Sequence, residues 1–306
     1  MKHDLEAYYA DLRRRSVRQL EARQRECAAL DPAFSALRAK RSRVFFIPAQ
    51  GAKLTLSTLR MEEEALLKKY GLPRDYLLPA YVCPLCKDTG YVGDPVRQKC
   101  ACRLKLEQQY LAEAARINER ETFEGFREDI YPDEASRQKG KKVFAFCEKY
   151  ADTLPTPKIR QLYLYGMTGR GKSFMGNAIA ARAIEHGIET LRLTAYRMNE
   201  EIMKGFSTND SPLARFTRVP LLVLDDLGTE AMIPNVTAES LFAIADQRNT
   251  SRLATVYISN LNADELATRY GERTASRILD AAISRAIVFD GESLRVKKEG
   301  DRGCCT

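Results

Sequence analysis

The stretch Leu162-Tyr163-Leu164-Tyr165, followed by Gly166-Met167-Thr168-Gly169-Arg170-Gly171-Lys172-Ser173, decides the fold of this 306-residue chain. Its apolar part predicts a buried strand, and the residues after Ser173 predict a helix. The pattern G-x-x-x-x-G-K-S between a strand and a helix is typical of a phosphate-binding loop, and a chance glycine-rich turn would lack both flanks. Backbone N–H groups of the loop would surround the phosphates, Lys172 would reach the β- and γ-phosphates, and Ser173 would ligate Mg²⁺. We therefore expect the loop to bind ATP or GTP with Mg²⁺.

A second element carries two carboxylates directly after a strand. The four aliphatic residues 221–224 predict a buried parallel strand, and Asp225 and Asp226 follow it. Ligands bind at the carboxyl ends of parallel strands, so we assign Asp225 to Mg²⁺ and Asp226 to polarising the attacking water. An acidic turn without such a role is the alternative, which the upstream phosphate loop disfavours. Nucleotide hydrolysis is the expected chemistry.

The rest of residues 121–306 alternates between strands and helices. Strands are predicted at 160–165, 189–194, 221–224, 254–258 and 286–289, with helices at 134–150 and 172–186 among the segments between them. This alternation is typical of an α/β fold with a parallel sheet covered by helices on both faces.

Four cysteines form a cluster in the sequence: Cys83, Cys86, Cys100 and Cys102. The spacing C-x-x-C, thirteen residues, then C-x-C supplies four thiolates, which is enough for one tetrahedral Zn²⁺. Four protein ligands leave no position for water, so the predicted zinc is structural. Thiols without a metal, or thiols with a redox role, remain the alternatives.

The positive charge of the chain lies in its N-terminal part. The whole chain carries +8, and residues 1–120 hold 23 basic and 15 acidic side chains, whereas residues 121–306 hold 26 of each. We predict a basic, mainly helical domain over 1–120, with helices at 3–30, 32–43, 57–70 and 103–120, and a second domain over 121–306. Such charge favours an acidic partner surface or nucleic acid, and a solvated helical arm is the alternative.

The chain is expected to be cytoplasmic. It has no apolar run long enough for a membrane span, and its N-terminus is too charged for the apolar core of a signal peptide. No membrane partner is therefore predicted.

Residues 123–295 resemble the AAA+ ATPases, and within them the replicative helicase loaders of the DnaC/DnaI type. The segment Val256-Tyr257-Ile258-Ser259-Asn260 resembles the strand that ends in sensor 1, which implies that Asn260 lies beside the γ-phosphate. Residues 271–277 resemble the segment with the arginine finger, which implies that Arg277, with Arg273 as a rival, completes hydrolysis in a neighbouring subunit. Residues 289–295 resemble the last strand and its sensor 2, Arg295. The resemblance also implies an AAA+ core without a C-terminal lid domain.

The same resemblance implies partners. The zinc-binding N-terminal domain would bind a hexameric replicative helicase, with the apolar stripe along residues 5–30 as the candidate face, and the ATPase domains would self-associate when assembled. Single-stranded DNA would contact the helix after the second strand, through Tyr196, Arg197, Lys204 and Phe206, although Tyr196 and Phe206 could instead be core residues. A transposition helper ATPase of the IstB type is the related alternative, disfavoured by the cysteine cluster. A nucleotide-switched adaptor that hydrolyses little ATP is the third possible function.

Overall fold

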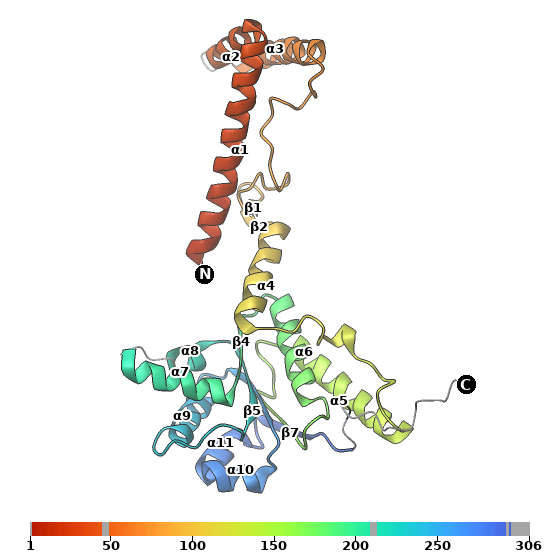
Figure 1. The fold of residues 1–306 in the computed structure, drawn as a ribbon, viewed down its shortest axis with the longest axis vertical. Coiled ribbons are helices and arrows are strands. Elements are labelled where there is room, and N and C mark those ends of the chain that lie inside the picture. The colour runs from red at the N-terminus through yellow and green to blue at the C-terminus, as the bar shows by residue number, and fades with distance from the viewer. Residues whose placement is uncertain (1, 45–48, 209–212, 292–293, 295–306) are drawn as a thin grey trace, which may run out of the picture. The chain divides into compact units, whose positions relative to one another are not determined.

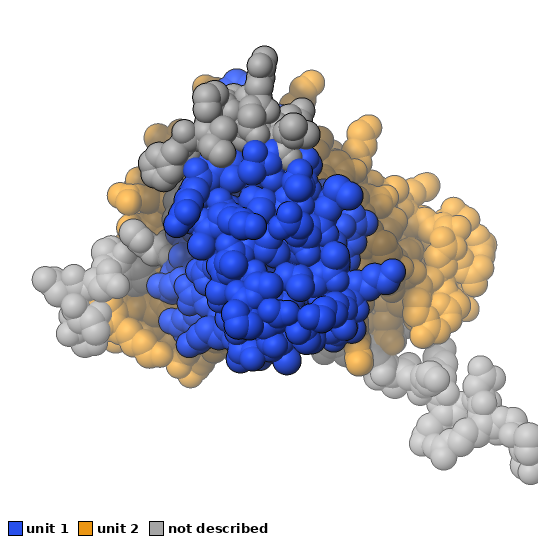
Figure 2. Space-filling model, turned by 90° about the horizontal axis from the view of Figure 1, so that it is seen from above, with its two compact units in different colours: residues 1–105 blue, residues 106–306 orange. Residues whose placement is uncertain are grey.

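A computed structural model describes residues 2–44, 49–208, 213–291 and 294 of the chain. The chain forms two compact units, residues 1–105 and 106–306, which Figure 2 colours separately. This division lies fifteen residues before the boundary expected at 120/121. The reason is that the second half of the helix Ala101–Ala115 packs in the second unit, where Leu111 and Ala115 contact Ile184.

Unit 1 is helical, with a small two-stranded sheet near its end. It contains α1 (Lys2–Leu30), α2 (Pro32–Arg43), α3 (Ala49–Lys69) and the antiparallel strands β1 (Tyr91–Val92) and β2 (Gln98–Lys99). Asp31 separates α1 from α2 and caps α2, since its carboxylate accepts a 2.9 Å hydrogen bond from the N–H of Ala33. Pro32 takes the first helical position, where a missing N–H costs nothing.

The apolar stripe of α1 is partly used inside unit 1. Leu5 is buried, and Cys27 packs against Phe34 and Leu67 in the core of the helical part. Tyr8 and Leu30 remain 39% and 53% exposed. The stripe is therefore not one continuous free face.

Unit 2 contains a sheet that lies among helices (Figure 1). This sheet has five parallel strands in the order β4-β5-β6-β3-β7. The strands are β3 (Gln161–Tyr165), β4 (Thr190–Thr194), β5 (Leu221–Leu227), β6 (Ala254–Ser259) and β7 (Ser284–Val288). The predicted α/β fold with a parallel sheet is thus confirmed.

Helices cover both faces of this sheet. Alternate side chains of the strands enter two separate cores, so that Leu162 and Leu164 face one and Tyr163 faces the other. The first core lies under α5 (Glu134–Asp152) and α6 (Lys172–Glu185). The second lies under the remaining helices, which are α7 (Ala195–Thr208), α8 (Leu213–Arg218), α9 (Thr237–Thr250), α10 (Ala263–Tyr270) and α11 (Glu272–Ile278). None of the helices in the described ranges is both long and apolar enough to cross a membrane.

The division between the units falls inside α4 (Ala101–Ala115), and the chain that follows α4 is fastened to α6. The helix ends at Ala115, and the next residue, Arg116, has a left-handed φ of 52°, so α4 stops short of the predicted residue 120. The buried side chain of Asn177 then holds the next turn. Its amide donates to the carbonyls of Asn118 (2.9 Å) and Glu121 (2.8 Å), and its oxygen accepts from the N–H of Asn118 (3.1 Å).

A buried arginine joins three elements of unit 2. Arg248 of α9 is fully buried, and its guanidinium donates to the carbonyls of Phe216 (2.8 Å), Val219 (2.9 Å) and Ala254, and to the hydroxyl of Thr255 (2.8 Å). Burial lowers the pKa of Arg248 to about 10, so it stays charged at neutral pH. The cation thus satisfies backbone acceptors in the last turn of α8, directly after α8 and at the start of β6.

Replacing Arg248 by methionine is expected to lower the free energy of unfolding by about 3 kcal/mol or more, because several buried acceptors lose their donor. The chain has no tryptophan, so urea unfolding followed by circular dichroism is the suitable measurement. Arg218→Met, at an exposed arginine of α8, is the control and should change it by less than about 0.5 kcal/mol. Equal urea midpoints for the two variants would contradict the role of Arg248.

Candidate functional site

The phosphate-binding loop connects β3 to α6, as its sequence predicts. Gly166 has a φ of 134°, and a side chain there would collide with the carbonyl of Phe289, which follows β7. Gly171 has a φ of 87° and forms the N-cap of α6. These two positions require glycine, since other residues rarely adopt such backbone angles. The loop therefore leads into the N-terminus of α6, where backbone N–H groups are available to bind an anion.

Lys172 connects the loop to the strand that ends at Asn260. Its Nζ donates to the carbonyls of Gly166 (2.6 Å) and Met167 (2.7 Å) and to Oδ1 of Asn260 (2.9 Å). Lys172 is also largely buried, with 6% of its surface exposed. The structure thus brings together a loop lysine and the candidate sensor 1 residue, which are 88 positions apart.

Asn260 is itself held by contacts between neighbouring backbone segments. The hydroxyl of Ser259 donates to the carbonyl of Leu227 (2.6 Å) and accepts from the N–H of Leu261 (3.0 Å). The hydroxyl of Tyr163 donates to the carbonyl of Leu261 (2.7 Å). The end of β6 is therefore tied to both β5 and β3.

The two carboxylates after residue 224 point to different surroundings. Asp225 is buried, whereas Asp226 is exposed, with a left-handed φ of 55° at a register shift of β5. Oδ1 of Asp225 accepts from the hydroxyl of Ser173 (3.1 Å) and from the N–H of Asp226 (3.0 Å). Asp225 and Ser173 thus meet as expected of a Mg²⁺ site, and a carboxylate and a hydroxyl are the oxygen donors that Mg²⁺ prefers.

Sequence reasoning missed Arg192 of β4. Its Nη2 lies 2.8 Å from Oδ2 of Asp225. A lone arginine in the apolar strand Thr-Leu-Arg-Leu-Thr, one strand away from the two aspartates, was the available signal.

A cavity of about 390 Å³ lies over the loop. Its lining includes Asp226 and Asn260 together with most of the loop. Another part of the lining was not predicted. It comes from the segment that follows α4: Glu121, Gly125, Phe126, Arg127, Ile130 and Tyr131. Phe126 stacks on Phe144 of α5 at 4.3 Å between ring centroids, which fixes this part of the lining to the core.

The candidate finger arginines do not line this cavity; both lie on α11, against α9. Nε of Arg277 lies 2.7 Å from Oδ1 of Asp246, and the guanidinium of Arg273 lies 4.6 Å from the ring centroid of Phe242. Arg295 is outside the described residues. The N–H of Leu294 donates to the carbonyl of Gly169 (2.8 Å), so the chain just before Arg295 runs beside the loop.

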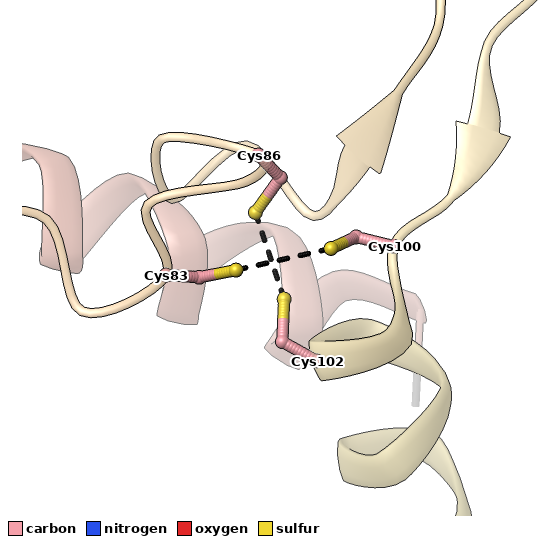
Figure 3. Close-up of side chains that lie close together, drawn as sticks. All are labelled: Cys83, Cys86, Cys100 and Cys102. Carbon is pink, nitrogen blue, oxygen red and sulfur yellow. Dashed lines mark hydrogen bonds between the residues drawn. The ribbon is translucent and has the colours of Figure 1, made fainter.

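The four clustered cysteines meet in unit 1 as their spacing predicts. Figure 3 shows their sulfur atoms pointing toward one another, two from the loop before β1 and two from the region between β2 and the start of α4. The sulfur atoms all lie within 4.8 Å of one another, with Cys83 to Cys100 at 3.8 Å and Cys86 to Cys102 at 3.5 Å. A zinc ion with Zn–S bonds of about 2.3 Å requires S···S distances of about 3.8 Å, whereas a disulfide requires about 2 Å. The donor set and its spacing therefore fit a structural zinc.

Hydrogen bonds shape the loop that carries Cys83 and Cys86. The buried carboxylate of Asp88 accepts from the N–H groups of Val82 (3.1 Å) and Cys83 (2.8 Å), and the N–H of Gly90 donates to the sulfur of Cys86 (3.4 Å). Such contacts around the ligands orient a metal site.

Helix α1 covers the same cluster. The hydroxyl of Tyr9, which is 2% exposed, lies 3.4 Å from the sulfur of Cys102. A side chain at Gly90 would come within 2.9 Å of the Tyr9 ring. Arg13 donates to the carbonyl of Asp88 at 2.8 Å. The first half of α1 therefore packs on the cysteine loop.

The thiols of the cluster differ in acidity. The backbone N–H of Cys86 lowers the pKa of Cys83 to about 7, while burial raises the pKa of Cys102 to about 12. Since zinc binds thiolates, Cys83 loses its proton to the metal more readily than Cys102 does.

The candidate DNA residues lie on α7. Tyr196 is 57% exposed and Lys204 is exposed, whereas Met198 and Ile202 are buried in the core, so Tyr196 is not a core residue. Arg197 is partly exposed. The side chain of Phe206 is outside the described part of the structure.

Comparisons with known proteins give one family model and several relatives that match the chain. Residues 97–301 match the family model of the IstB-like ATP binding protein. The chain is 28% identical over 220 residues to the replicative helicase loader DnaI of Bacillus subtilis, covering 68% of this chain and 69% of DnaI. It is 27% identical over 168 residues to the replicative helicase loader DnaC of Buchnera aphidicola subsp. Schizaphis graminum, covering 53% of this chain and 66% of that protein. A crystal structure of DnaI matches 62% of the chain with a TM-score of 0.48 and 24% identity.

The resemblance to DnaC/DnaI-type AAA+ proteins is thus confirmed, and unit 2 has the nucleotide-binding α/β core that the sequence predicts. With two thirds of its length matched by one family model, the chain belongs to the IstB-like ATP binding protein family.

Proposed function

We propose that this protein is an ATP-dependent loader of a replicative DNA helicase onto single-stranded DNA. The observation that carries the proposal is the hydrogen-bonded set at the phosphate loop, in which Lys172 contacts Asn260 and Ser173 contacts Asp225. This set belongs to a chain whose curated relatives are named replicative helicase loaders.

The residues at the loop suit ATP hydrolysis. Lys172 would exchange its contacts with the Gly166 and Met167 carbonyls for contacts with the β- and γ-phosphates. Ser173 and Asp225 would hold Mg²⁺, which neutralises charge on the phosphates. Asp226, exposed at the cavity, would polarise the attacking water, with Asn260 and Arg295 beside the γ-phosphate.

An arginine from a neighbouring subunit would complete this site. Its positive charge would stabilise the charge that develops on the transferred phosphoryl group, which makes hydrolysis depend on assembly. We assign this role to Arg277. Arg273 remains the rival, since both side chains lie exposed on α11.

Mixed assemblies test the finger. Arg277→Ala is expected to lower the helicase-stimulated ATPase rate at least about 100-fold. Mixing it with Lys172→Ala, which lacks its own nucleotide site but keeps Arg277, should restore part of the rate. Arg273→Ala is the matched control and should keep most of the rate. A normal rate for Arg277→Ala together with a lost rate for Arg273→Ala would transfer the role to Arg273.

The N-terminal unit would bind the helicase. Residues 1–105 hold 21 basic and 12 acidic side chains, so the unit suits an acidic partner surface. A zinc ion at Cys83, Cys86, Cys100 and Cys102 would be structural, holding the loop on which α1 packs.

Single-stranded DNA would lie along α7. Tyr196 offers an exposed aromatic ring on which a base can stack, and Arg197 and Lys204 offer positive charge for phosphates. Phe206 is proposed with them from the sequence.

Native mass spectrometry of the full chain mixed with the host's replicative helicase tests the loader proposal. We expect a defined complex that is lost when residues 1–105 are deleted. The variant Arg14→Glu/Arg15→Glu adds negative charge at exposed positions of α1 and should weaken the complex if the unit's basic charge is used. Absence of any complex, with ADP, with a non-hydrolysable ATP analogue or without nucleotide, would contradict the proposal.

The metal content tests the cysteine site. One zinc per chain is expected by elemental analysis, and Cys83→Ser should lose it, because a tetrahedral site needs all four thiolates. Cys147→Ala, at a buried cysteine in the core of unit 2, is the control and should keep the metal. Full zinc content in Cys83→Ser would refute this ligand set.

A transposition helper is the second candidate, favoured by the description of the matched family model. Its predicted partner is a transposase, so the failure of the helicase complex would make a transposase the next partner to test. A nucleotide-switched adaptor would bind ATP but hydrolyse it slowly. A measured ATPase rate therefore distinguishes it from the helicase loader and from the transposition helper.

A further inference from the structure

We propose that Arg192 is the positioning residue of Asp225, and that its charge makes the Mg²⁺ site depend on bound nucleotide. This inference rests on the proposed ATP hydrolysis. It assigns a role to a side chain that neither the phosphate-loop motif nor the two-aspartate motif contains.

The geometry places Arg192 against the metal-binding carboxylate alone. In β4, the neighbours Leu191 and Leu193 enter the core under α7, so Arg192 points to the other face of the sheet, where Ser173 and Asp225 meet. Nη2 of Arg192 lies 2.8 Å from Oδ2 of Asp225. Nε of Arg192 is buried and has no hydrogen-bond partner among the described residues, so Asp225 is the polar partner that the described part of the chain offers to this guanidinium.

Three hydrogen bonds therefore fix the Asp225 carboxylate. Oδ1 accepts from the hydroxyl of Ser173 and the N–H of Asp226, and Oδ2 accepts from Arg192. Because the Ser173 hydroxyl donates a hydrogen bond to Asp225, the lone pairs of its oxygen stay available to a cation. The carboxylate is thus oriented before any metal arrives, which lowers the cost of reorganisation.

The charge of Arg192 has a second effect. Asp225 is buried, and an adjacent guanidinium offsets its negative charge at a position where water screens poorly. Mg²⁺ gives up its waters reluctantly and usually binds through one or two carboxylates together with substrate phosphates. A compensated carboxylate attracts free Mg²⁺ weakly, whereas the phosphates of a bound nucleotide add the missing negative charge. The site would therefore take Mg²⁺ with the nucleotide.

Charge-removing and charge-keeping variants of the full chain test this role. For Arg192→Gln, we expect the Mg²⁺ concentration that half-saturates binding of a fluorescent ATP analogue to fall at least about fivefold, because a positive charge next to the ion is gone. Arg192→Lys keeps the charge and should stay close to the wild type. The Mg²⁺ dependence of the steady-state ATPase rate should shift in the same direction. Arg192→Met, also uncharged, serves as a second variant if Arg192→Gln does not fold.

Arg182→Gln is the matched control. Arg182 of α6 is a partly buried arginine that pairs with carboxylates outside the nucleotide cavity, among them Glu124 and Asp152. Its loss should lower thermal stability without moving the Mg²⁺ midpoint.

The outcomes separate this inference from the proposed function. An unchanged or higher Mg²⁺ midpoint in Arg192→Gln, with a wild type that binds and hydrolyses ATP, overturns the inferred effect of the Arg192 charge on the Mg²⁺ site and leaves the loader proposal standing. A wild type that neither binds the analogue nor hydrolyses ATP in the presence of the helicase overturns both.

Discussion

Parallel pairing of β3, β5 and β6 is the constraint on which the nucleotide site depends. Parallel strands present their carboxyl ends at one edge of the sheet, so the loop after β3, the aspartates near the end of β5 and Asn260 after β6 converge there. The register sets the convergence: Ser259 lies opposite Tyr165 on one side and Leu227 on the other. The strand order therefore brings the residues of the site together, and hydrogen bonds between their side chains then connect them.

Much of the fold could be predicted because the local signals agree with the tertiary packing. Four of the five predicted strands of unit 2 are apolar and form the largely buried strands β3 to β6, while β7 lies at the edge of the sheet and stays mostly exposed. The Asp31-Pro32 step marks the start of α2 as expected. Ends and boundaries were harder. α4 stops just before a left-handed Arg116, a conformation that no residue type demanded, and the unit boundary moved because Leu111 and Ala115 bury themselves on α6. Such contacts join segments that are far apart in the sequence. The spacing of apolar residues within one segment does not predict them.

Some residues of the candidate site could be predicted from the sequence, and others could not. The loop, Asp225, Asp226 and the four cysteines follow contiguous motifs with fixed spacing, and the structure brings each group together. Arg192 and the wall around Phe126 and Tyr131 belong to no motif, because they act through neighbours that only the folded sheet supplies. Tyr196 lay between two interpretations in the sequence, and its exposed ring on α7 excludes the core interpretation.

The stretch that follows α4 has two attachments at once. Asn177 fastens Asn118 and Glu121 to α6, and the residues from Glu121 to Tyr131 form one wall of the nucleotide cavity. Its length is therefore fixed by its contacts at both ends. An inserted residue would displace either the backbone that Asn177 binds or the side chains of Phe126 and Tyr131 that line the cavity. This short passage should therefore admit substitutions and exclude insertions.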